Sequence, residues 1–205
     1  MSGMTLNLTR QDAADFALKN QYALAMFTDA GLDYIACRCC ILNMLHSGFR
    51  LASDAIEKLL KAHIFLATGA RTKLQGKDLH NSYALKQELN FVRLDKRLDS
   101  FDDLLRKLYD HFESRYFDNP VTRRGASSEE LAQIDELFIH LVETLPMPDE
   151  VKYRSFFLAS LCNENSRRYW KNYHWAIEHN QTLQAKMPRI EHTYRAVFKH
   201  LYPEA

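Results

Sequence analysis

Residues that break helices are scarce in this chain and unevenly placed. Only five of its 205 residues are proline, and all five lie between 120 and 203, so residues 1–119 contain none. The six glycines lie mostly at the edges of segments with helical spacing. Helix interiors tolerate neither residue well. We therefore predict an all-α fold.

Long apolar runs and a strong net charge are missing as well. No run approaches the roughly 18 residues that span a bilayer, because Arg38 interrupts the best candidate, residues 34–45. The first ten residues lack the apolar core of a secretory signal. The formal charge is +1, so the net charge gives no indication of nucleic-acid binding. A local basic patch is still compatible with this charge. We expect a cytoplasmic protein with no membrane part and with reduced cysteines.

Motifs for metal or cofactor chemistry are also lacking. On a helix Cys37 and Cys40 share a face, whereas Cys39 points elsewhere, and no second ligand pair accompanies them. We predict buried thiols, no metal site and no cofactor. The sequence has no glycine-rich phosphate loop, serine nucleophile elbow or carboxylate–histidine diiron motif.

The chain is instead rich in apolar residues at helical spacing, most clearly over residues 52–69. One face of this helix carries Ala52, Ala55, Ile56, Leu59, Leu60, His63, Leu66 and Ala67. The other face carries Asp54, Glu57, Lys58 and Lys61. Glu57 and Lys61 are spaced i,i+4 as a supporting ion pair, and Gly69 supplies a stop signal.

Further helices are predicted on both sides of this one. A capping box at Thr9–Asp12 opens a helix that we expect Gly31 to break, followed by a second helix to about Leu45. Residues 78–94 and a segment from Ser100 also have helical spacing, and residues 115–126 are predicted to form a loop.

A second capping box, at Ser127–Glu130, begins a helix that Pro146 ends. Two more helices are expected at about 150–182 and 188–201. We therefore divide the chain into a helical bundle over residues 1–146, including an extra N-terminal helix, and a helical extension over 147–205 that packs on the same domain.

Three segments in this order resemble the HEPN domain, the helical bundle named for higher eukaryotes and prokaryotes nucleotide-binding. The first holds Asp33, Tyr34 and Arg38 and continues through EKLLKA (residues 57–62) to Gly69. The second is DLHNSYAL (residues 78–85), and the third is Arg115–Tyr116. The resemblance covers roughly residues 30–146 and implies an up-and-down bundle that forms a homodimer. The helices on either side would be additions.

The resemblance implies two classes of function. Some HEPN proteins are metal-independent ribonucleases in toxin, phage-defence or RNA-processing systems, and others bind nucleotides or a partner, often a nucleotidyltransferase. We expect nucleotide or RNA binding in a stress, defence or toxin–antitoxin setting, without strong catalysis and with a nucleotidyltransferase or antitoxin as a partner. The alternatives are a ribonuclease that uses an Arg–His pair and a structural, dimeric interaction module.

The ribonuclease alternative rests on the family's Arg-x4-6-His motif, in which arginine holds phosphate and histidine moves protons. Arg115 lies near the family position, but the next histidine is His140, far outside the window. The pairs that fit elsewhere are Arg106/His111, Arg167/His174, Arg168/His174 and Arg195/His200, and short motifs often match by chance. Only Arg167 and His174 would share a helix face. The catalytic candidates are therefore Arg167 or Arg168 with His174. The other interpretation is that this segment consists of packing residues with charged neighbours.

The candidates for phosphate binding are Lys58, His80, Arg115 and Tyr116. Lys58 belongs to a charged helix face that is either simply solvated or one wall of a ligand groove. The His80 side chain either forms hydrogen bonds at a helix end or binds the ligand. Arg115 and Tyr116 belong to a basic and aromatic segment suited to phosphates and bases, or to a plain surface loop. His63, on the apolar face, is expected to be a hydrogen-bonded core residue rather than a ligand contact.

Overall fold

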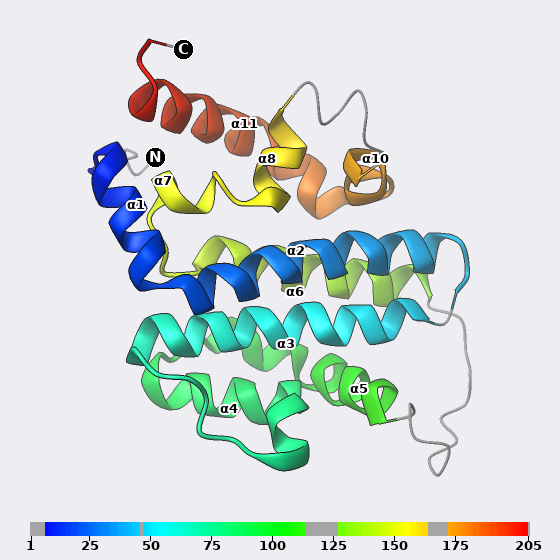
Figure 1. Cartoon of the computed structure of the whole chain (residues 1–205). Helices are drawn as coiled ribbons and strands as arrows, with labels where there is room; N and C mark the ends of the chain where they lie inside the picture. Colours follow the sequence, from blue (N-terminus) through cyan, green and yellow to red (C-terminus); the bar gives the residue numbers. More distant parts are fainter. Residues whose placement is uncertain (1–6, 46, 114–126, 164–171, 205) are drawn as a thin grey trace.

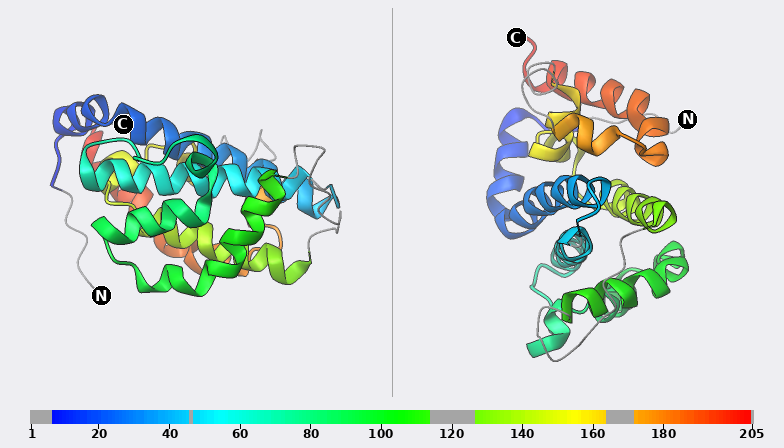
Figure 2. Two further views of the ribbon diagram at one scale, coloured as in Figure 1. Left: turned by 90° about the horizontal axis from the view of Figure 1, so that it is seen from below. Right: turned by 90° about the vertical axis from the view of Figure 1, so that its right-hand side faces the viewer.

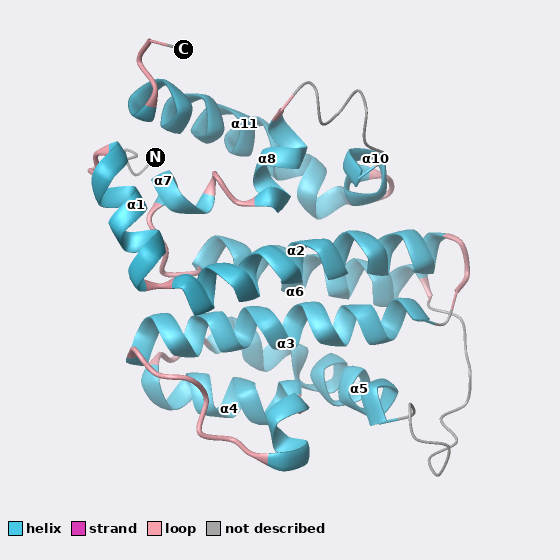
Figure 3. Ribbon diagram, in the orientation of Figure 1, coloured by secondary structure: helices cyan, strands magenta, loops and turns pink. Residues whose placement is uncertain are grey.

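The computed structural model describes residues 7–45, 47–113, 127–163 and 172–204. These residues form α-helices and two short 3-10 helices, with no strand among them, which confirms the predicted all-α helical bundle (Figure 3). None of the described helices combines the length and apolar character needed to cross a bilayer. The elements are α1 (Arg10–Lys19), α2 (Gln21–Leu42), α3 (Ser47–Thr68), η1 (Gly76–His80), α4 (Ser82–Val92), η2 (Lys96–Phe101), α5 (Asp102–Glu113), α6 (Ser128–Thr144), α7 (Asp149–Lys152), α8 (Phe156–Cys162), α10 (Asn172–Ile177) and α11 (Gln181–Leu201).

The helices are stacked in layers, with α2 and α6 in the middle (Figures 1 and 2). Helix α3 runs antiparallel to α2 and packs along its length. Helices α4 and α5 cover the far side of α3, while α8, α10 and α11 cover the opposite side of α2 and α6. Because α2 is enclosed on two sides, it is apolar around most of its circumference rather than along one stripe.

Aromatic side chains connect the middle layer to the C-terminal helices. The Tyr34 ring of α2 stacks on Phe138 of α6 at a centroid distance of 3.8 Å. Phe157 of α8 meets both rings edge-on, at 5.7 Å from Tyr34 and 5.3 Å from Phe138. All three residues are fully buried. The extension therefore shares one core with the bundle.

The helix ends follow the local signals. Both predicted capping boxes are present, at Thr9–Asp12 before α1 and at Ser127–Glu130 before α6. Gly69 follows α3 with a φ of 71°, a left-handed conformation that glycine adopts without strain. Helix α6 ends at Thr144, just before Pro146.

The predicted break at Gly31 is wrong. Helix α2 runs through Gly31 without interruption, and the first helix instead ends at Lys19, with Asn20 as its cap. A Cβ atom added to Gly31 would lie 2.6 Å from the Cβ of Phe157. Glycine is needed here because α8 approaches α2 closely, not because the helix turns.

The predicted helices at 150–182 and 188–201 are also wrong in their bounds. The described part of the first holds three short helices, α7, α8 and α10, rather than one long helix. Pro188 lies inside α11 instead of beginning it. That helix begins at Gln181, where the Asn180 side chain accepts a hydrogen bond from the Leu183 N–H at 2.9 Å.

Candidate functional site

A buried carboxylate on α3 holds two basic side chains. Glu57 Oε1 accepts a hydrogen bond from Lys61 Nζ at 2.6 Å, which is the predicted i,i+4 ion pair. His80 Nδ1 lies 3.1 and 3.2 Å from the two Glu57 carboxylate oxygens. Glu57, Lys61 and His80 are called the α3 polar cluster below.

The α3 polar cluster is not the solvated face that the simpler interpretation expected. Glu57 and Lys61 are each only 7% exposed. The segment that follows α3 folds back along this helix as far as η1, which places His80 against Glu57. The His80 side chain is 42% exposed, so the cluster reaches solvent through this imidazole.

Aromatic and basic side chains border the α3 polar cluster. The Tyr22 ring of α2 lies 5.1 Å from the Phe65 ring, and the Arg71 guanidinium lies 4.7 Å from the Tyr22 ring centre. The pKa of Tyr22 is raised, mainly by burial and also by the negative charge of Glu57, while the positive charge of Arg71 acts in the opposite direction. Tyr22, Arg71 and Glu57 therefore lie in one electrostatic neighbourhood.

Lys58 is held by a different carboxylate from His80. Its ammonium pairs with Asp33 of α2, and both side chains are partly exposed. Burial raises the pKa of Asp33, although the hydrogen bond and charge of Lys58 act in the opposite direction. The contacts of the described residues thus do not join Lys58 to His80.

Several predicted site residues lie outside the described residues: Arg115, Tyr116, Arg167 and Arg168. His174 lies on α10 with an exposed side chain, and its ring is 5.9 Å from that of Tyr173. The pairing of His174 with either candidate arginine therefore stays a prediction.

The two remaining Arg–His pairs do not converge. Arg106 stacks on the Tyr83 ring at 3.8 Å, while His111 stacks on the Phe49 ring at 4.4 Å. In α11, His200 Nε2 lies 2.9 Å from the Leu8 carbonyl oxygen, and Arg195 is exposed. Neither pair forms a common site.

His63 is a core residue, as predicted. Its Nε2–H donates to the Leu141 carbonyl at 2.9 Å, and the residue is 2% exposed. Burial lowers the pKa of His63 to about 4, so the imidazole is neutral at pH 7.

Sequence reasoning missed the main polar network of the fold. Arg38 is fully buried, and its guanidinium pairs with Asp135 of α6. Asp135 also accepts from the Tyr34 hydroxyl at 2.8 Å, and that hydroxyl accepts from Asn180 Nδ2 at 2.7 Å. The available signal was one arginine in an otherwise apolar helical segment, which must find a buried partner.

The same guanidinium fixes the C-terminal end of α10. Arg38 Nε donates to the Trp175 carbonyl at 2.8 Å, and a second guanidinium nitrogen donates to the Glu178 carbonyl. A cation at the carbonyl end of a helix is favourable because those carbonyls lack partners within the helix.

No group of three or more metal-ligating side chains gathers among the described residues. Cys37 is buried, and burial raises the pKa of its thiol; Cys39 and Cys40 are only half-buried, which corrects the expectation for those two. Comparisons of the chain with protein-family models, curated proteins and solved structures found no match.

Proposed function

We propose that this chain is a HEPN-like protein that binds a nucleotide or RNA through the α3 polar cluster. The observation that supports this is the contact between Glu57 and His80. It joins EKLLKA and DLHNSYAL, two of the segments that carry the family resemblance, and it brings an imidazole to the surface beside a buried ammonium.

The chemistry of the α3 polar cluster suits a phosphate group. Glu57 orients both Lys61 and His80, so less side-chain freedom is lost when a ligand binds. Lys61 is a point charge and the His80 imidazole can donate a hydrogen bond, while Arg71 adds a guanidinium fork nearby. One carboxylate thus stands among three basic groups, and the Tyr22 ring offers a surface for a base.

Isothermal titration of the protein with AMP, ATP and a short single-stranded RNA tests this proposal. We expect His80→Ala to weaken binding about tenfold, the loss of one charge-assisted hydrogen bond. The control is His179→Ala, because His179 is exposed and also has a neighbouring carboxylate, Glu178 at 3.9 Å. Absence of binding, or equal losses in the two variants, contradicts the proposal.

A metal-independent ribonuclease is the second candidate, favoured by the exposure of His174 on a firmly held helix. Arg38 binds the backbone just after His174, at the Trp175 and Glu178 carbonyls, and so holds the C-terminal part of the helix that carries this imidazole. RNA cleavage in the presence of a chelator, lost in His174→Ala and kept in His179→Ala, would support it. Equal cleavage by both variants excludes His174.

The homodimer belongs to the same proposal, and exposed apolar residues at the end of α4 support it. Phe91 is 91% exposed and Leu94 66% exposed. A neighbouring pair of this kind is costly to leave in water. Sedimentation should show a dimer that Phe91→Lys dissociates; a monomeric wild-type protein contradicts it.

A further inference from the structure

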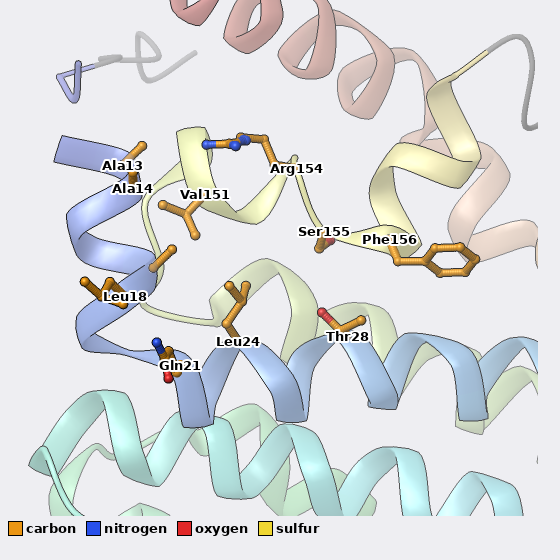
Figure 4. A pocket seen from close by; sticks show the side chains of 11 residues that line it. Ala13, Ala14, Leu18, Gln21, Leu24, Thr28, Val151, Arg154, Ser155 and Phe156 are labelled. Carbon is orange, nitrogen blue, oxygen red and sulfur yellow. The ribbon is translucent and has the colours of Figure 1, made fainter. Parts of the chain in front are cut away.

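An open pocket of about 500 Å³ lies between α1, α2 and the segment that joins α7 to α8 (Figure 4). Small side chains of α1, Ala13, Ala14 and Ala17, form one wall, and Leu24 and Thr28 of α2 form the floor. The volume is typical of small-molecule sites, which are mostly apolar with a few polar groups. In Figure 4 the pocket lies on the side of α2 away from α3, so it is separate from the α3 polar cluster.

Polar side chains of the pocket lack partners among the described residues. Ser155 is 4% exposed, and its hydroxyl makes no hydrogen bond. Thr68, Thr144 and Thr193 each donate to the carbonyl four residues earlier, but the Thr28 hydroxyl makes no such bond with the described chain. A buried hydroxyl without a partner costs free energy, so the Ser155 hydroxyl is suited to an outside ligand, and the partly exposed Thr28 hydroxyl offers a second hydrogen bond.

Arg154 supplies the charge. Its guanidinium lines the pocket above the apolar walls, and it forms no ion pair with any residue that the structure describes. Guanidinium groups bind carboxylates through two parallel hydrogen bonds. A ligand that fits these walls therefore has an apolar body and one anionic head.

We propose that this pocket binds a small amphipathic carboxylate. Its alkyl body packs against Ala17, Leu24 and Val151, and its carboxylate pairs with Arg154. The Thr28 and Ser155 hydroxyls hydrogen-bond to its polar atoms. This site does not depend on nucleotide or RNA binding.

Titration calorimetry with octanoate, hexanoate and 1-octanol tests the two halves of the ligand separately. Octanoate should bind about fifteenfold more tightly than hexanoate, because two more methylenes are buried. It should also bind at least tenfold more tightly than 1-octanol, which has the same chain without the charge.

Three variants locate the site. Arg154→Gln should weaken octanoate binding at least tenfold and leave 1-octanol binding unchanged. Ala17→Leu fills the pocket and should abolish binding of both; Thr28→Leu fills it from the floor if the first variant does not fold. Arg195→Gln, which removes an exposed arginine of α11, should change neither.

The proposal is overturned by non-saturable binding, by affinity that ignores chain length, or by equal effects of Arg154→Gln and Arg195→Gln. It is also overturned if Ala17→Leu changes the sedimenting mass of the protein while octanoate does not bind. The pocket would then be a protein contact surface.

Discussion

Asp135 neutralises a charge that has no access to water. Its partner Arg38 is fully buried, and their ion pair lies between α2 and α6. We expect Asp135→Asn to lower the free energy of unfolding by about 3–5 kcal/mol, because the arginine stays buried without a counter-charge. Urea unfolding followed by circular dichroism measures this loss.

The adjacent residue provides the control for that measurement. Glu136 pairs with Arg97 at 2.7 Å, but both side chains are about half exposed. Glu136→Gln should cost less than about 1 kcal/mol, as exposed ion pairs usually do. Similar losses in the two variants would show that the buried network contributes no more than a surface pair.

His63 makes stability depend on pH. Its pKa is about 4 in the folded protein and 6.5 when unperturbed, so between these values the unfolded chain binds a proton that the folded chain does not. Stability from this group is therefore complete above pH 6.5 and falls as pH falls towards 4, by about 3 kcal/mol in all. Unfolding of wild type and His63→Gln should be compared at pH 7.5, 6 and 5. The difference between them isolates His63, and a constant difference across this range contradicts the prediction.

At the scale of the helix, Gly31 determines how closely α2 and α8 approach. An alanine Cβ would overlap the Cβ of Phe157, an atom bonded directly to the backbone of α8, so rotation of a side chain cannot relieve the contact. Gly31→Ala should cost about 1–3 kcal/mol despite the better helix propensity of alanine. Asp29→Ala, on the exposed face of the same helix, should leave stability nearly unchanged. Thermal unfolding of both variants tests this, and a stabilised Gly31→Ala would refute the contact.

Gly31 and Pro188 also show why helix boundaries were partly beyond sequence reasoning. Capping boxes act within four residues, so Thr9–Asp12 and Ser127–Glu130 were readable directly. The role of Gly31 depends on Phe157, which is far away in the chain. Pro188 is exposed, and the helix around it buries Leu183, Met187, Ile190 and Val197, a gain that exceeds the local penalty of proline.

The candidate sites, like the helix boundaries, were predictable from the sequence only where the interaction is local. The Glu57–Lys61 pair followed from spacing alone, since both residues belong to one helix. Its burial did not, because that depends on the return of the chain and on His80. The Arg38–Asp135 pair and the pocket beside Arg154 each join segments about a hundred or more residues apart, and spacing carries no such information.

The whole molecule should unfold as one unit, because the C-terminal helices share the core of the bundle. Both tryptophans, Trp170 and Trp175, follow Pro148, so their fluorescence reports on the extension while circular dichroism reports on all helices. We expect the two urea transitions to coincide. A chain truncated after Pro148 should lose cooperative unfolding, because the Arg38 and Phe138 side chains, which the C-terminal helices bury, would be exposed to water. Separate transitions, or a stable truncated bundle, would show two independent units.

The clamp on the start of α1 has a consequence during protein synthesis. The Asn7 and Leu8 backbone N–H groups donate to Glu150 Oε1 at 2.7 and 2.8 Å, and the Leu8 carbonyl accepts from His200. At ribosomal rates of about 5–20 residues per second, His200 is added roughly 10–40 s after Leu8. Helix α1 can therefore make these contacts only after the chain has been synthesised as far as His200. Docking of the start of α1 is thus limited by the arrival of α11, although α1 is synthesised first.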